Sequence, residues 1–287
     1  MTENFARDLI NAGVHFGHGA SRWNPKMAPY IAAKRSDTHI IDVKKTIAGV
    51  IIAKKLLTEV VAAGKDVVFI GTKRQARDAV RAAAEDCRMH YVNTRWLGGT
   101  LTNFRTIRSR LQRLVQLESM ATDGQLSSES KKRASRLKRE MRKISTNLSG
   151  IREMSRLPGA IAVVDAKQEH LALHEAAKLN IPSVAVIDTD SDPDTVSVPI
   201  PANDDSIRAI ELILNELSEA VKAGKIMASQ KPESPKPKRR TSRRPVLARA
   251  AEPAEQTPEE IQETRPQEPA GEPAGDQHEA PPPQTQQ

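Results

Sequence analysis

Aromatic residues make up only 3% of this 287-residue chain, and there is a single cysteine, Cys87. One cysteine can form neither an internal disulfide nor a cysteine-rich zinc site, which favours a reducing compartment. The sequence contains no run of about 18 apolar residues, so we expect no membrane-spanning helix. Its first residues, MTENFARD, predict neither a secretory signal nor a transit peptide. We therefore expect a cytoplasmic protein with no membrane partner.

Acidic residues are outnumbered: 36 Asp and Glu stand against 44 Lys and Arg, which gives a net charge of +8. Between residues 95 and 156 we count fifteen basic and five acidic residues, an excess of ten. This one segment therefore accounts for more than the whole net charge. A local basic excess favours a polyanionic partner, with nucleic acid ahead of an anionic membrane.

The chain changes composition after residue 225. Residues 226–287 contain no aromatic residue and twelve of the nineteen prolines, with a basic block (KPESPKPKRRTSRR) before an acidic one. Such a segment buries too little apolar surface to offset the entropy lost on ordering. We predict that residues 226–287 form a disordered, proline-rich, charged tail.

Residues 1–225 alternate between strand-like and helix-like patterns. The β-branched runs are HIID, DVVFIG, AIAVVDA and SVAVIDT, and the helical patterns cover residues 44–63, 74–87, 168–179 and 204–225. This alternation predicts an α/β fold with a parallel sheet covered by helices on both faces. We assign residues 1–96 and 157–225 to this globular domain.

An insertion without strands interrupts the alternation at residues 97–156. Apolar residues recur there at intervals of three and four, first at Phe104, Ile107, Leu111 and Leu114, then at Leu137, Met141, Ile144, Leu148 and Ile151. Two such helical seams joined by a polar, glycine-containing turn predict an antiparallel coiled-coil hairpin.

The predicted hairpin has few acids to pair with its bases, since KKRASRLKREMRK holds one Glu among eight basic residues. A solvated helical face with i, i+4 ion pairs is the alternative, but like charges on neighbouring turns repel unless an anion neutralises them. We therefore favour a polyanion-binding surface. Its candidate RNA contacts are Arg105, Arg108, Lys131, Lys132, Arg136 and Arg139.

Two further segments carry candidate nucleic-acid contacts. VVFIGTKRQA predicts a strand, a glycine turn and a helix that begins near Lys73 and Arg74, but it lacks both common glycine-rich phosphate motifs. It is an ordinary strand–helix turn or an RNA-phosphate contact, with a nucleotide pocket less favoured. In SRWNPKM, packing and nucleotide contact fit equally well; its candidate contacts are Arg22, Trp23 and Lys26.

Acidic residues gather after the last buried run, in VIDTDSDPD and NDD. Asp188, Asp204 and Asp205 could hold a divalent ion if the second segment folds back, although helix capping explains the second group more simply. His15 and His18 have a spacing that could supply two ligands, but hydrogen-bonded histidines in a glycine-rich loop are favoured. We expect no cofactor, with a divalent metal ion as the minority alternative.

Seven segments, in order, resemble the family of bacterial small-subunit ribosomal protein two. They are AGVHFGH, RWNPKMAPYI, HIIDVKKT, VVFIGTKRQA, YVNTRWLGGTLTNFRTIR, LPGAIAVVDAKQEHLALHEAAKLNIPSVAVIDTDSDPD and IPANDDSIRAIELI. The resemblance implies a flavodoxin-like sheet, no catalysis, and a structural place in the small ribosomal subunit. The partners it implies are small-subunit rRNA and neighbouring ribosomal proteins, including ribosomal protein one.

The resemblance also gives the segment RWLGGTLTNF a role. We expect the pair Gly98 and Gly99 to let the backbone leave the sheet at a tight angle. Trp96 then packs at the root of the hairpin, and Arg95 points to rRNA. Two other functions stay open at this point: a nucleotide-binding α/β enzyme and a free RNA-binding protein.

Overall fold

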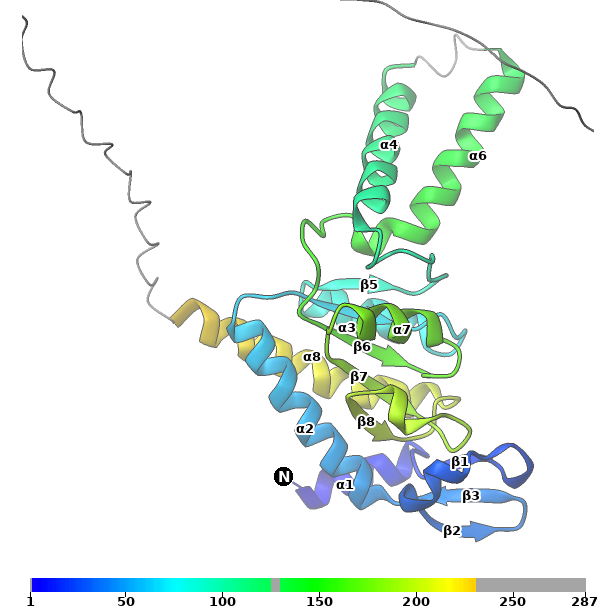
Figure 1. Cartoon of the computed structure of the whole chain (residues 1–287), viewed down its shortest axis with the longest axis vertical. Coiled ribbons are helices and arrows are strands. Elements are labelled where there is room, and N and C mark those ends of the chain that lie inside the picture. Colours follow the sequence, from blue (N-terminus) through cyan, green and yellow to red (C-terminus); the bar gives the residue numbers. More distant parts are fainter. Residues whose placement is uncertain (1, 125–129, 231–287) are drawn as a thin grey trace, which may run out of the picture. The chain divides into compact units, whose positions relative to one another are not determined.

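The computed structural model describes residues 2–124 and 130–230 of the chain (Figure 1). Most of the tail predicted for residues 226–287 lies outside the described residues. Its first five residues belong to the last helix, α8, which runs from Ile207 to Gln230 and so ends later than expected. No helix in the described part of the chain is both long and apolar enough to cross a membrane.

A five-stranded parallel sheet forms the centre of the fold, with the strand order β5-β4-β6-β7-β8. The strands are β4 (Val67–Ile70), β5 (His90–Val92), β6 (Ala160–Val164), β7 (Ser183–Ile187) and β8 (Val198–Pro201). Counted along the chain, this order is 2-1-3-4-5, that of flavodoxin-like folds. The predicted α/β class is confirmed.

Each face of the sheet packs against its own set of elements, because alternate residues of a strand point to opposite faces. Val67 and Phe69 of β4 join the core under α1 (Thr2–Asn11), α2 (Val43–Ala62), α3 (Arg77–Asp86) and α8. Val68 and Ile70 join a second core, under α7 (His170–Lys178) and the segment around Trp96. Burial on both faces explains why these strands are nearly continuous apolar runs.

A second, smaller sheet was not predicted. The run HIID was expected in the parallel sheet, but it lies mainly in β3 (Thr38–Ile41), the middle strand of an antiparallel sheet with β1 (Phe16–Gly19) and β2 (Ile31–Arg35). Four consecutive residues of β2 are exposed, and because alternate residues point to opposite faces, this strand is open to solvent on both. Strand β8 was also missed, because Pro199 and Pro201 disfavour a strand everywhere except at a sheet edge, which is its position.

Two helices, α4 (Phe104–Thr122) and α6 (Lys131–Leu148), stand side by side between β5 and β6 of the chain (Figure 1). We call them the α4–α6 pair. The seam of α4 is buried at Ile107, Leu111 and Leu114. On α6 only Leu148 is fully buried, and the other expected seam residues are half-buried. The coiled-coil geometry therefore stays a prediction. Short 3-10 helices complete the fold: Ala20–Arg22, Pro25–Tyr30, Ser149–Ile151 and Pro193–Thr195.

We expect Leu111→Ala to lower the free energy of unfolding by about 2–5 kcal/mol, because Leu111 packs in the core beneath the pair and its truncation leaves a cavity. Val115→Ala is the matched control on the same helix, since Val115 is 51% exposed. Urea denaturation of both variants measures the difference. Equal losses of stability would contradict the assignment of the buried face.

Candidate functional site

In open α/β sheets, ligands bind at the carboxyl ends of the strands, where the strand order reverses. Here that point lies between β4 and β6, and a lysine fills it. Lys73 lies in the turn before α3, whose first residue is Arg77, so it is not at the helix start as predicted. Its Nζ lies 2.7 Å from Asp205 Oδ1, 2.8 Å from Asp204 Oδ1 and 3.7 Å from Asp165 Oδ2.

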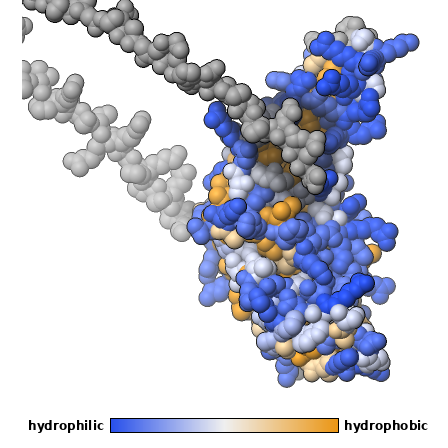
Figure 2. Space-filling model, turned by 45° about the vertical axis from the view of Figure 1, so that its right-hand side comes forward, coloured by the Kyte–Doolittle hydropathy of each residue, from blue (hydrophilic) through white to orange (hydrophobic). Residues whose placement is uncertain are grey.

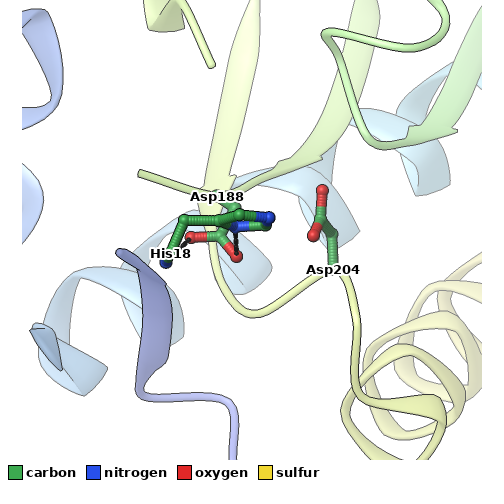
Figure 3. A group of neighbouring side chains, drawn as sticks. All are labelled: His18, Asp188 and Asp204. Carbon is green, nitrogen blue, oxygen red and sulfur yellow. Dashed lines mark hydrogen bonds and ion pairs between the residues drawn. The ribbon is translucent and has the colours of Figure 1, made fainter. Parts of the chain in front are cut away.

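A histidine from the small sheet supplies a second cation (Figure 3). His18 Nδ1 lies 2.8 Å from Asp188 Oδ2, and its Nε2 lies 3.4 Å from Asp205 Oδ2. The backbone N–H of His18 donates to Asp188 Oδ1 and to Thr189 Oγ1. At Gly17 a Cβ atom would lie 2.6 Å from Thr189 Cγ2, so glycine is required for this close approach. The segment of β1 therefore closes the end of β7.

We call these six residues the carboxylate cluster: Lys73, His18, Asp165, Asp188, Asp204 and Asp205. The hydrogen bond to Asp188 raises the pKa of His18 to about 9. Burial lowers the pKa of Lys73, but the hydrogen bonds to Asp204 and Asp205 outweigh burial and raise it above its ordinary value. Burial, together with the charges of Asp165 and Asp188, raises the pKa of Asp204. Both cations are therefore charged near neutral pH and neutralise buried carboxylates.

The three predicted metal candidates do come together in this cluster. Ligand atoms of His18, Asp188 and Asp204 lie within 4.8 Å of one another, whereas Asp205 is half-exposed. The Lys73 ammonium group already pairs with Asp204. A metal ion in this cluster would have to displace that ammonium group and also the proton on His18. The metal site stays a prediction. The hydrogen-bonded role expected for His18 is confirmed, but His15 Nδ1 is buried without a hydrogen-bond partner in the described part of the chain.

The turn after β5 is organised by a residue that sequence reasoning missed, Glu175 of α7. Its carboxylate accepts hydrogen bonds from the Trp96 indole N–H at 3.1 Å and from the backbone N–H groups of Gly99, Leu101 and Thr102 at 2.8, 3.0 and 3.1 Å. Burial raises the pKa of Glu175, but bonds from Thr102 and Gly99 bring it below the ordinary value. Trp96 is buried at the root of the α4–α6 pair, as predicted.

The sequence does contain a signal for Glu175. It follows Ala172 by three positions, which places it on the buried face of an amphipathic helix. A lone acid on such a face needs buried donors, and the turn provides them.

The predicted RNA contacts of the α4–α6 pair are all exposed: Arg105, Arg108, Lys131, Lys132, Arg136 and Arg139. Arg136 and Arg139 line an open groove of about 570 Å³ together with Arg110, Glu140 and Lys143. Arg110 and Lys143 were not among the candidates. The spacing of Arg136, Arg139 and Lys143 along α6 could have identified the last of them, because it places all three on one helical face.

The other predicted RNA contacts differ in their exposure and in their present partners. Three of them are exposed: Arg22, Arg74 and Arg95. Trp23 is 37% exposed and lies 5.1 Å from the ring of His39. The Lys26 ammonium pairs with Asp192 and Asp194, each at 2.8 Å, and Lys73 is held by the carboxylate cluster. RNA contact by these two lysines would therefore have to compete with their present partners.

We expect the stabilising contribution of His18 to depend on pH. Because its folded pKa is raised, the contribution is fully present below the ordinary value of 6.5 and is lost as pH rises through about 9. At about 1.4 kcal/mol per pKa unit, the loss is at most roughly 3.5 kcal/mol. The charged groups around the ring are Asp188, Asp190, Asp204, Asp205 and Lys73.

The measurement is urea denaturation between pH 6 and 9.5 in a chelating buffer. His18→Gln should remove this part of the pH dependence, whereas His174→Gln, at an exposed position on α7, should keep it. Parallel pH profiles for wild type and His18→Gln would show that His18 carries no such charge.

Known proteins resemble this chain over most of its described residues. A family model described as ribosomal protein S2 matches residues 9–224. The small ribosomal subunit protein uS2 of Rhodopirellula baltica is 52% identical over 225 residues, which is 78% of this chain and 86% of the relative. That of Syntrophobacter fumaroxidans is 47% identical over 219 residues, which is 76% of this chain and 80% of the relative. The chain therefore belongs to the ribosomal protein S2 family, as a structural, non-enzymatic component of the small ribosomal subunit in the cytoplasm.

Proposed function

We propose that this chain binds small-subunit rRNA chiefly through the α4–α6 pair, and that it helps to dock ribosomal protein one. The charge of the two helices is the observation that supports rRNA binding. The two helices hold twelve basic and two acidic residues. Both acids are paired, Glu140 with Arg113 at 3.4 Å and Glu118 with Arg152 at 2.6 Å. The two helices therefore carry ten more basic than acidic residues.

Phosphate is the anion that fits this surface best. The bases are exposed, and several converge on the groove between the two helices, where Arg and Lys side chains can reach a sugar-phosphate backbone. A membrane surface would need large apolar side chains on the same exposed face. On α4 the apolar residues Ile107, Leu111 and Leu114 are buried instead.

We expect replacement of four bases of α6 by Gln to weaken rRNA binding by about tenfold or more near 0.1 M salt. The salt dependence should flatten by up to about 0.9 for each phosphate that the protein no longer neutralises. The replaced residues are Lys131, Lys132, Arg136 and Arg139. Helicity should persist, because Gln forms helices about as well as Lys and Arg. Filter binding at several salt concentrations, beside circular dichroism, measures both properties.

A matched variant replaces four exposed bases elsewhere by Gln: Lys44, Lys55, Lys178 and Arg208. It removes the same charge, so it separates a local effect from a general one. Equal affinity and equal salt slope for the two variants would contradict the assignment of RNA binding to the α4–α6 pair.

Docking of a protein partner calls for an apolar surface outside the basic pair. The face shown in Figure 2 is mostly hydrophilic, with smaller hydrophobic patches. Four large apolar residues are about half-exposed within the first 52 residues of the chain: Ile10, Phe16, Ile51 and Ile52. They lie on α1, β1 and α2, and α1 contacts α2. Exposed apolar side chains of this kind support a protein contact more than an RNA contact.

We expect the double variant Ile51→Ser, Ile52→Ser to bind purified ribosomal protein one about tenfold more weakly, because it removes two exposed apolar anchors from α2. Leu171→Ser is the control, at a 49% exposed leucine on α7. Surface plasmon resonance with each variant gives the affinities. If only Leu171→Ser weakened binding, the docking surface would lie on α7 and the assignment to α2 would be wrong.

A further inference from the structure

The turn between β5 and α4 contains two adjacent glycines, and the chain needs only one of them. Gly99 has a φ of +88°, in the left-handed region that favours glycine. Gly98 has no positive φ, and a Cβ atom built there would meet no other atom within 4 Å. Alanine therefore fits at position 98 of the free chain without strain. The expectation that both glycines serve the tight turn holds for Gly99 alone.

Glu175 fixes which side of this turn faces outward. Its carboxylate binds the indole of Trp96 and the N–H groups of Gly99, Leu101 and Thr102 from below, and it is itself only 7% exposed. The Thr102 hydroxyl adds a further bond at 3.2 Å. Gly98 is left on the exposed side of the turn. The turn is thus held in one shape before any partner binds.

The surroundings of Gly98 favour an anionic partner. Between residues 93 and 110 there are four arginines and no acidic residue. Arg95 and Arg105, on either side of the turn, are exposed. The nearby carboxylate of Glu175 is engaged inside the turn. The side-chain amide of Asn103 is exposed and can donate to phosphate or sugar oxygens.

We propose that the 96–102 turn is a contact for the sugar-phosphate backbone of rRNA, with Gly98 at the point of closest approach and Glu175 as the positioning residue that holds the turn. The proposal rests on the proposed rRNA-binding function and adds a second contact surface, at the root of the α4–α6 pair. The missing side chain at position 98 lets a nucleic-acid backbone approach the main chain, while the two arginines neutralise its phosphates.

Gly98→Ala tests the contact without disturbing the fold. Its thermal midpoint should be unchanged or slightly higher, because alanine at an unstrained position restricts the unfolded chain. Its affinity for small subunits stripped of this protein by a high-salt wash should fall about tenfold, as one added methyl group overpacks a close contact. The control is Gly64→Ala, where φ is +74° and a Cβ also meets no atom within 4 Å.

The two glycine variants should show opposite effects. Gly64 precedes the amino end of β4, whereas the 96–102 turn follows the carboxyl end of β5. Gly64→Ala should therefore leave binding unchanged, and it should lower the thermal midpoint because alanine is strained at a positive φ. Wild-type affinity for Gly98→Ala would overturn the proposal while leaving rRNA binding itself intact. Failure of the wild-type chain to bind stripped subunits would instead overturn the proposed function.

Glu175→Gln tests the positioning role. Gln keeps the size of Glu but has only one acceptor oxygen, so the turn should loosen. The chain has two tryptophans, so Trp96 can be followed alone by fluorescence in a Trp23→Phe background, where its emission should shift to longer wavelength. With Trp23 intact, Glu175→Gln should weaken binding about tenfold with an unchanged salt slope, because no phosphate-contacting base is removed. A shifted emission with wild-type affinity would exclude the positioning role.

Discussion

Two cations, Lys73 and His18, neutralise carboxylates that the fold buries at the carboxyl edge of its sheet, and much of the architecture depends on this compensation. Asp188 and Asp204 are each 1% exposed, and isolated charges at that depth would be strongly destabilising. The ion pairs join segments far apart in sequence: the turn after β4, the strand β1 and the segment before α8. Removing one partner leaves the others buried without a counter-charge, so the cluster also determines which segments can meet there.

The same compensation explains why a sheet of the flavodoxin order carries no chemistry in this family. The place where such sheets receive a ligand is filled by the chain's own ammonium and imidazolium groups, and β1 closes it from outside. The surfaces that we propose for partners are peripheral: a pair of basic helices, the turn at their root and exposed apolar residues on α1 and α2. The sheet acts as a rigid support that holds these surfaces at set positions.

The parts of the fold that follow from local patterns were predictable from sequence. Apolar runs marked β4, β6 and β7, and the burial of Trp96 was expected from its place at the root of the predicted hairpin. Contacts across long sequence separation were not predictable, because nothing in HLALHEAAK names the donors that Glu175 binds, and His18 and Asp188 are 170 residues apart. Strand β8 was hidden by its prolines. The glycine pair was misjudged because a sequence does not reveal φ, which separates Gly98 from Gly99.

The uneven charge of the α4–α6 pair means that salt acts on the free protein and on its complex in opposite directions. Along α6, bases three and four positions apart repel by about 0.2–0.5 kcal/mol per pair, and salt screens this repulsion. Added salt therefore stabilises the free helix. The proposed rRNA complex would draw its affinity from counterion release, which the same salt opposes. If α6 binds rRNA as proposed, the phosphates serve as its counter-charge, and the helix is held most firmly in that complex.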